Sequence, residues 1–431
     1  MFKKSRNLLA LSLAIAMVLS FSLIIDAEEE VVNLRFASLA WQTEAIEANK
    51  EIVEEWNENN PNIQVEYVQK DWGGIHDYMM TGFETGEVPD IFHYESAAIV
   101  DWAESDLLTD LEPLMSEEMK KDIYGPAWES VELPDGGVYG VPFLWESRLT
   151  VYNQDLFEEA GVEPGTIDDP WTWEDLRDAA KKLTVVEDDS VERYGAGMGL
   201  RQPGSSFMNY SLSYNGGFVR EEDGEFSIKV GEPEMRIMEL VYEMLHEDES
   251  LSPDSIGQTA SDMMPGFYAE KYAMVPAVGV WIRQQINQDS PDGFNWGIMP
   301  PLKGENQNQG ANTQTLSIPE QVEHKEEAME FIEFFLNKEN MGRLAKGDWL
   351  LPTRKSTAES SEFQKEEDGW NVASNSAQHL IAPPWRHMSG FSEFKDRSLD
   401  STLQRLFAEQ ISLEEAAEMI EREGNRIIES R

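Results

Sequence analysis

A short aromatic and charged segment, WESR at 145–148, separates two apolar runs that read VYGVPF and LTVYN. Runs of this kind, rich in β-branched and aromatic residues, are typical of β-strands. An indole ring presents a flat apolar face, and a carboxylate accepts hydrogen bonds from hydroxyl groups. Glu146 therefore has the chemistry to accept hydrogen bonds from ligand hydroxyls, and we expect part of a ligand site at this segment. For Trp145 two interpretations stay open, a ring that faces the ligand or a hinge or core residue.

A second candidate for the same chemistry is Trp41, in the loop from Ser38 to Gln42. The loop follows an alternating apolar pattern at 32–36, which predicts a strand, and it precedes a helical pattern. Open α/β sheets bind ligands at the carboxyl ends of their strands. We therefore expect Trp41 to lie at a binding site.

The elements that must position these residues are short strands alternating with amphipathic helices. Strand patterns at 32–36 and 63–67 flank a helical stretch, for which Thr43 is the expected N-cap. Capping-box patterns that begin at Thr172 and Ser412 predict two further helices. This alternation predicts an α/β fold, and no internal repeat or long linker interrupts it.

The composition limits the possible partners. The chain has 431 residues, enough for two or three domains, and its 82 acidic and 34 basic residues give a formal net charge of −48. Nucleic acid is excluded as a partner because phosphate binding needs the opposite sign. The chain contains no Cys and only six scattered His, so we expect no disulfide, no thiolate metal site, no lipid-modified Cys, no bound metal and no cofactor.

The first residues are typical of an export signal. Lys3, Lys4 and Arg6 precede a stretch without charge from Leu8 to Ile25. We expect cleavage after Ala27. The apolar stretch is long for a signal core and reaches the lower limit of a membrane span, so an uncleaved anchor stays an alternative. We expect an exported protein, periplasmic or at the extracellular cell surface, either free or held by this segment.

Further motifs follow one another along the chain. They are TGEVPDI at 85–91, DLFEEAG at 155–161, EKYAMVPAVGVWI at 270–282, WGIMPPLKG at 296–304 and WLLPTRKS at 349–356. In this order, together with the YGVPF and YN motifs, they make the chain resemble the extracellular solute-binding proteins that feed ABC importers. The resemblance is to the sugar and oligosaccharide branch, similar to maltodextrin-binding proteins, and it covers nearly the whole mature chain.

The resemblance implies a periplasmic-binding-protein type II fold, with two interwoven α/β lobes, a hinge and a cleft between the lobes. After a signal at 1–27, the N-terminal lobe would take residues 28–145 and 301–347. The C-terminal lobe would take residues 146–300 and 348–431. The chain would cross between the lobes near 145–147, 300–301 and 347–350.

The same resemblance implies a monomeric receptor without catalysis. It would capture a carbohydrate in the cleft and deliver it to ABC-transporter permease subunits. Trp281 matches a stacking tryptophan of maltodextrin binders, and Glu146 has the spacing of a sugar-contacting glutamate before the YN motif. The acidic residue expected three positions after Tyr94 is replaced by Ala97, so maltose is not the expected ligand. The expected ligand-binding residues are Trp41, Gln42, Thr43, Glu44, Tyr94, Glu95, Glu146, Phe207, Trp281, Asn312 and Trp385.

Two other classes of protein stay open at this point. A secreted glycoside hydrolase would also pair aromatic rings with carboxylates, because its mechanism needs two acids beside the bond, although no eightfold βα repeat is visible. A receptor for a cationic solute such as a polyamine would use acids and aromatic rings as a cage. Affinity that collapses with added salt would distinguish a cationic ligand from a neutral sugar.

Overall fold

The computed structural model describes residues 31–134, 136–188, 190–222 and 224–430. The expected signal segment at 1–27 lies outside these residues. Within the described ranges, no helix has the length and apolar character needed to cross a membrane.

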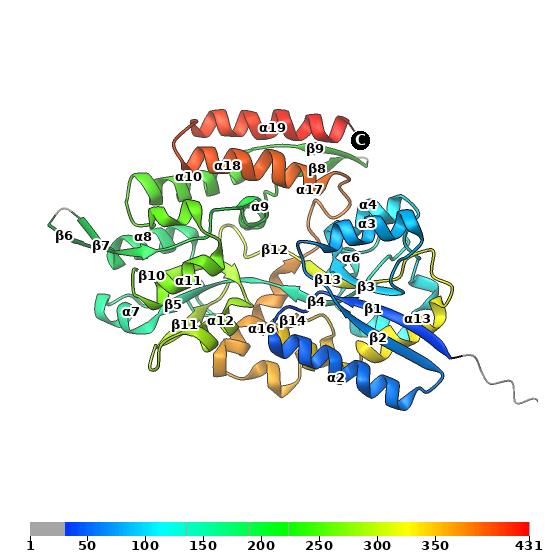
Figure 1. The fold of residues 1–431 in the computed structure, drawn as a ribbon. Coiled ribbons are helices and arrows are strands. Elements are labelled where there is room, and N and C mark those ends of the chain that lie inside the picture. Colours follow the sequence, from blue (N-terminus) through cyan, green and yellow to red (C-terminus); the bar gives the residue numbers. More distant parts are fainter. Residues whose placement is uncertain (1–30, 135, 189, 223, 431) are drawn as a thin grey trace, which may run out of the picture.

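The first of two main sheets has six strands in the order β14-β4-β13-β3-β1-β2 (Figure 1). The pairs β1/β2 and β1/β3 are parallel, and β13 joins β3 to β4 in antiparallel register. The strands are β1 (Val32–Ser38), β2 (Ile63–Gln69), β3 (Ile91–Glu95), β4 (Val141–Glu146), β13 (Asn312–Ser317) and β14 (Leu351–Pro352).

The helices of this half are α2 (Thr43–Asn59), α3 (Ile75–Thr85), α4 (Ser96–Glu104), α5 (Glu117–Asp122), α6 (Gly125–Glu129), α13 (Lys325–Phe335), α14 (Lys338–Asp348), α15 (Lys355–Ala358) and α16 (Trp370–Ser376). The predicted βαβ unit is present as β1, α2 and β2. The expected N-cap is wrong by one residue, because Thr43 is already helical and Gln42 occupies the cap position without a capping side chain. The Gln42 amide instead donates to the carbonyl of Asp348 at 2.9 Å.

The second main sheet has five strands in the order β11-β5-β10-β7-β6. They are β5 (Arg148–Asn153), β6 (Val185–Glu187), β7 (Ser190–Ala196), β10 (Tyr272–Gly279) and β11 (Trp296–Met299). The helices of this half are α7 (Gln154–Ala160), α8 (Trp173–Leu183), α9 (Gly204–Leu212), α10 (Glu232–His246), α11 (Ala260–Tyr268), α12 (Ile282–Asp289), α17 (Phe391–Glu393), α18 (Ser401–Phe407) and α19 (Leu413–Glu429). The capping boxes predicted at Thr172 and Ser412 are confirmed at the starts of α8 and α19.

The chain passes directly from one sheet to the other at Ser147. Glu146 ends β4 in the six-stranded sheet, and Arg148 begins β5 in the five-stranded sheet. Ser147 is fully buried, and its hydroxyl bonds to that of Ser376 at 2.5 Å. A two-stranded sheet of β12 (Gln309–Gly310) and β15 (Leu380–Ile381) lies between the two halves in Figure 1. We call the half around the six-stranded sheet the first lobe and the other half the second lobe.

The expected lobe boundaries stay a prediction, and the packing of one stretch favours a different assignment. Leu350, Phe363, Trp370 and Leu380 belong to the hydrophobic cluster that covers the six-stranded sheet, although the expectation gave 348–431 to the second lobe. From Trp385 onward, the buried residues belong to the cluster of the second lobe. The expected and the observed boundary differ because β14 pairs with β4, which keeps this stretch on the first lobe. Such pairing depends on tertiary packing.

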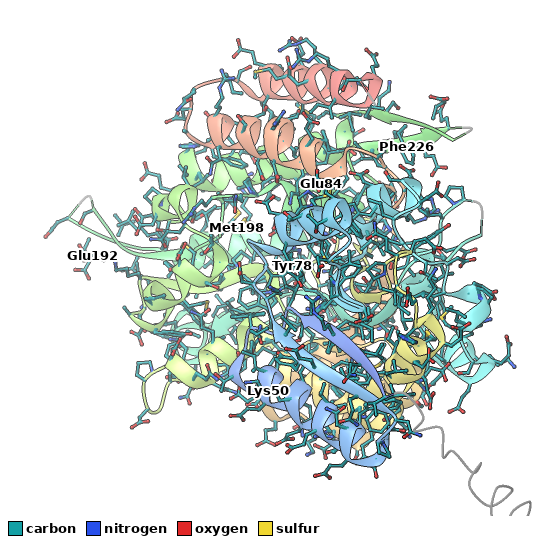
Figure 2. The ribbon with its side chains drawn as sticks, turned by 45° about the vertical axis from the view of Figure 1, so that its right-hand side comes forward. Lys50, Tyr78, Glu84, Glu192, Met198 and Phe226 are labelled. Atoms are coloured by element: carbon teal, nitrogen blue, oxygen red, sulfur yellow. The ribbon has the colours of Figure 1, made fainter. Side chains whose placement is uncertain are left out.

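Acidic side chains project from the helices and from the outlying β6–β7 hairpin, where Glu192 is labelled in Figure 2. Because the net charge of −48 makes these carboxylates repel one another, we expect the urea midpoint to rise when sodium chloride is increased from about 0.02 to 0.3 M. The same comparison at about pH 4 is the control, because close to the pI of about 4.3 the net charge is near zero and little net repulsion is left to screen. A midpoint that is unchanged or lower in salt at neutral pH would contradict this expectation.

Candidate ligand-binding site

A cavity of about 240 Å³ lies between the two lobes, and we call it the interlobe cavity. Its walls carry four indole rings and three carboxyl groups. The lining residues are Trp41, Trp72, Glu95, Trp145, Glu146, Trp281, Asn312, Thr313, Gln314, Asp348 and Leu350. No Lys, Arg or His is among these described lining residues.

Strand register brings the polar side chains of the first lobe together. Asn312 on β13 is directly opposite Glu146 on β4. Gln314, two residues further along β13, is opposite Glu95 on β3. Residues two apart on a strand point to the same face of the sheet, so these four side chains lie at one edge of the cavity.

Two of the indole rings meet across the cavity. Trp41, from the loop after β1, packs edge-on against Trp281 at the start of α12, with 5.9 Å between the ring centroids and 79° between the planes. Trp41 is 54% exposed and Trp72 is 36% exposed, which is unusual for such large apolar side chains. Open indole faces at the mouth of a cavity are suited to stacking on the flat faces of a ligand.

Several buried polar atoms that face or adjoin the cavity have no hydrogen-bond partner among the described residues. They are Trp145 Nε1 and Asp348 Oδ1 on the cavity wall, and Gln42 Oε1 beside it. An unpaired buried donor or acceptor costs roughly 1 to 3 kcal/mol. Their grouping at one cavity indicates that a polar ligand supplies the missing partners.

Burial also perturbs the carboxyl groups of the cavity. It raises the pKa of Asp348 to about 7. Burial raises the pKa of Glu95 above its usual range, and Glu146 adds to the rise, whereas Lys395 opposes it. Glu146 has a cation within reach, because its Oε1 lies 3.6 Å from Arg148 Nη2. The arrangement places three carboxyl groups between aromatic faces. Carboxyl oxygens accept hydrogen bonds, so the cavity is suited to binding hydroxyl groups.

A smaller hollow of about 40 Å³ shares Glu95 and Asn312 with the interlobe cavity. Trp385 lines this hollow and stacks on Phe391 with 13° between the ring planes. Lys395 from the second lobe also lines it. The expected ligand residue Trp385 is therefore next to the interlobe cavity and outside its wall.

The structure brings together many of the residues expected from the sequence. Trp41, Glu95, Glu146, Trp281 and Asn312 all line the interlobe cavity, although they are far apart in the sequence. Their contact with a ligand stays a prediction, since the structure contains none.

The structure places two expected aromatic residues in the core. Phe207 is fully buried and packs against Tyr210 and Phe407 in the second lobe. Tyr94 is stacked on Trp102 at 5.3 Å, and it lies on the other face of β3 because Glu95, the next residue on the strand, lines the cavity. Neither aromatic side chain lines the interlobe cavity.

The polar residues at the start of α2 have different surroundings. Thr43 is exposed and does not line the cavity, and Gln42 is buried. Glu44 is exposed and joins the lobes, because its carboxylate accepts from Gln284 Nε2 at 2.5 Å and from Gln288 Nε2 at 3.2 Å. We describe these two bonds as the Glu44 bridge.

The sequence-based set lacks six residues that the structure places in the cavity wall: Trp72, Trp145, Thr313, Gln314, Asp348 and Leu350. Gln314 lies two residues after Asn312 on β13, so both side chains face the same side of the sheet. This spacing was visible in the sequence. Asp348 lies in the stretch 347–350, where a lobe crossing was expected. An acidic residue at that point was a usable signal.

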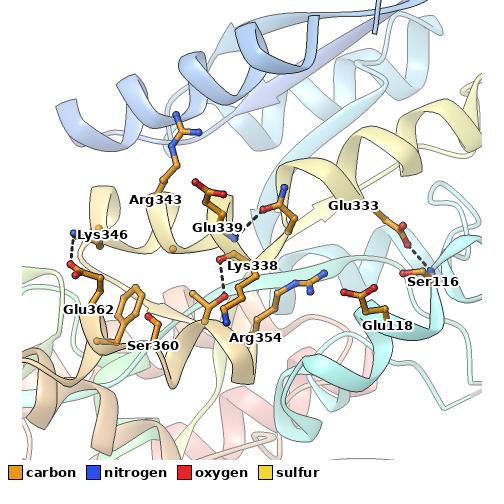
Figure 3. A pocket seen from close by; sticks show the side chains of 14 residues that line it. Ser116, Glu118, Glu333, Lys338, Glu339, Arg343, Lys346, Arg354, Ser360 and Glu362 are labelled. Atoms are coloured by element: carbon orange, nitrogen blue, oxygen red, sulfur yellow. Dashed lines mark hydrogen bonds and ion pairs between the residues drawn. The ribbon is translucent and has the colours of Figure 1, made fainter. Parts of the chain in front are cut away.

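A more spacious hollow than the interlobe cavity lies elsewhere, on the outside of the first lobe (Figure 3). Its volume is about 920 Å³, and its wall combines basic and acidic side chains in equal number. Many of these pair with each other or with neighbours, as in Lys346 with Glu362 at 3.0 Å and Arg343 with Glu51 at 2.8 Å. The wall contains a single aromatic ring, Phe363, so this hollow offers little of the chemistry of the interlobe cavity.

The model of one protein family, the bacterial extracellular solute-binding proteins, matches residues 40–342. An uncharacterized lipoprotein of Streptomyces antibioticus is 36% identical over 380 residues, which are 88% of this chain and 83% of that protein. An arabinooligosaccharide-binding protein of Bacillus subtilis is 26% identical over 295 residues, which are 66% of this chain and 65% of that protein.

Among solved structures, an ABC substrate-binding protein of Listeria monocytogenes in complex with cycloalternan has a TM-score of 0.75. Its identity to this chain is 21%, and the match covers 93% of this chain and 100% of that one. The likeness shows a shared fold, and the predicted two-lobed α/β architecture is confirmed.

Proposed function

We propose a function for this chain from its membership in the family of bacterial extracellular solute-binding proteins, to which it belongs. It is the receptor of an ABC importer and captures a sugar or oligosaccharide in the interlobe cavity. One observation carries the proposal: unpaired buried polar atoms and open indole faces line the same cavity. Sugars need both, because their rings have C–H faces and their rims have hydroxyls.

The names of similar proteins support this ligand class. One relative is named for arabino-oligosaccharides, and one structural neighbour contains cycloalternan. As a member of an extracellular family, the chain is exported. We infer that it works as a monomer, with the permease subunits of a membrane importer as its protein partners.

We also infer that the receptor binds its ligand without cleaving it. A glycoside hydrolase needs an acid and a base or nucleophile on opposite sides of the bond. In this chain Glu146 lies beside Arg148, with 3.6 Å between Oε1 and Nη2. No observation favours the hydrolase or the polyamine receptor over a sugar receptor.

Changing Glu146 to Gln is expected to weaken sugar binding by about fivefold to tenfold. The reason is that a charge-assisted hydrogen bond contributes roughly 1.5 to 3 kcal/mol, and the amide retains only a neutral one. The measurement is calorimetry against the best binder from a thermal-shift screen of neutral oligosaccharides. Small-angle scattering is expected to show less ligand-induced compaction in the variant, because ligand binding favours the closed lobes only through differential affinity.

The matched control is Glu174→Gln, because Glu174 also pairs with an arginine, at 2.6 Å, but lies outside the cavity. Its affinity for the sugar should equal that of the wild type. Shorter sugars released by the wild type and not by the Glu146 variant would contradict the receptor function and favour a hydrolase.

A further inference from the structure

Asp348 has an unusual position for an acidic side chain. It is the last residue of α14 and only 4% exposed, and its Oδ1 has no hydrogen-bond partner in the described part of the chain. Trp349 follows it in the left-handed conformation, at φ 54°, and ends the helix. The backbone of Asp348 is fixed by the bond from Gln42, so the carboxyl is held against the cavity.

No cation compensates this carboxyl. No salt bridge to Asp348 occurs among the described residues, and burial is the cause of its raised pKa. The titratable groups around it are Glu44 on α2 and Tyr67 on β2, with Glu95 and Glu146 across the cavity. The nearest cations are engaged elsewhere, Arg148 at 3.6 Å from Glu146 and Lys395 acting on Glu95, and neither lines the cavity. A negative group in the ligand would therefore meet a wall whose only charged side chains are carboxyl groups.

The unpaired atoms of the cavity wall specify what the ligand must offer. Asp348 Oδ1 and, beside the wall, Gln42 Oε1 are acceptors, and Trp145 Nε1 is a donor. A hydroxyl group satisfies either kind, and an amino group satisfies the acceptors. A carboxylate or phosphate at the same place brings further negative charge beside three carboxyl groups and has no proton to donate to the ionised Asp348 carboxylate.

We propose that Asp348 is a specificity-determining residue, whose carboxyl accepts a hydrogen bond from a ligand hydroxyl or amine. Through it the interlobe cavity selects neutral or amine-bearing sugars over sugars that carry a carboxylate or phosphate. The proposal rests on the proposed function, because it concerns the same cavity.

The raised pKa of Asp348 gives the proposal a pH signature. A ligand hydroxyl stabilises the ionised carboxyl, so the pKa of Asp348 falls on binding and a proton is released near neutral pH. Affinity should therefore increase as the pH rises from about 6 to 8. Burial also raises the pKa of Glu95, so the Asp348 variant is needed to assign the pH dependence to Asp348.

The test compares the wild type with Asp348→Asn on three sets of oligosaccharides: neutral hexose or pentose units, glucosamine units and uronic acid units. The wild type should bind a neutral or glucosamine oligomer at least tenfold more tightly than its uronic acid counterpart. In Asp348→Asn, affinity for the preferred oligomer should fall about tenfold, and its increase between pH 6 and 8 should disappear.

Two controls keep the result interpretable. The first is Asp90→Asn. Burial also raises the pKa of Asp90, but this aspartate lies outside the cavity and accepts a hydrogen bond from the backbone N–H of Arg35 at 2.7 Å. The Asp90 variant should retain the affinity and the pH dependence of the wild type. Asp348→Asn should melt no lower than the wild type above pH 7, since the buried charge is removed.

Equal binding of uronic acid and neutral oligomers by the wild type would overturn the selection. Unchanged affinity and pH dependence in Asp348→Asn would overturn the role of this residue, while sugar binding itself stands. If none of the three sets binds, the proposed function fails and the inference fails with it.

Discussion

Replacing Arg283 by Met is expected to lower the free energy of unfolding by about 2 to 4 kcal/mol. Arg283 is fully buried, and its guanidinium donates to the carbonyls of Val280, Asp368 and Trp349 at 2.8 to 3.2 Å. Without it, three buried carbonyls lose a donor, each at roughly 1 to 3 kcal/mol. The loss is partly offset because burial of the charge is itself unfavourable, as the lowered pKa of Arg283, about 9, shows.

The expected loss also includes ring contacts. The guanidinium carbon lies 4.1 Å from the ring centroid of Trp370 and 5.4 Å from that of Trp349. Urea unfolding is the measurement, with Arg397→Met as the control, because Arg397 is exposed and pairs only with Glu393 four residues before it. The control should change stability by less than about 0.5 kcal/mol. An unchanged urea midpoint in Arg283→Met would contradict the expectation.

Changing Trp281 to Ala is expected to weaken sugar affinity by roughly 1 to 3 kcal/mol, about fivefold to more than a hundredfold. The indole contributes its face to the interlobe cavity and holds Trp41 edge-on at 5.9 Å. Its removal therefore takes away one stacking surface and frees the other. Calorimetry with the preferred oligosaccharide measures the loss.

The control for this experiment is Trp171→Ala. Trp171 stacks on Phe157 in the second lobe and does not line the cavity. This variant should lose stability and retain affinity. If Trp281→Ala instead retains affinity and melts lower, Trp281 has a packing role and no stacking role.

The sequence predicted local features well, because they depend on neighbouring residues. The helix starts at Thr172 and Ser412 depend on side-chain and backbone groups three positions apart. The interruption between β4 and β5 was visible because charged residues separate two apolar runs. Trp41 and Glu146 were predicted at the site for similar reasons.

Features that depend on strand parity or on tertiary packing were harder to predict. A shift of one residue on β3 separates Tyr94, in the core, from Glu95, in the cavity wall. Phe207 belongs to the core because α9 packs on the second lobe, and no local pattern shows which helix face does so. Asp348 was missed because acidic residues are rarely buried without a partner, so burial was not expected.

The Glu44 bridge affects the conformational equilibrium of the receptor when no sugar is bound. Its bonds to Gln284 and Gln288 are made by the protein alone, so they favour the joined lobes even when no sugar is present. A net gain of about 1 kcal/mol changes the ratio of joined to separated receptors about fivefold. A membrane partner that recognises joined lobes would then meet empty receptors at a frequency that depends on Glu44, Gln284 and Gln288, of which Gln284 is buried. The strength of this bridge would therefore determine how often the importer meets a receptor that is joined but empty.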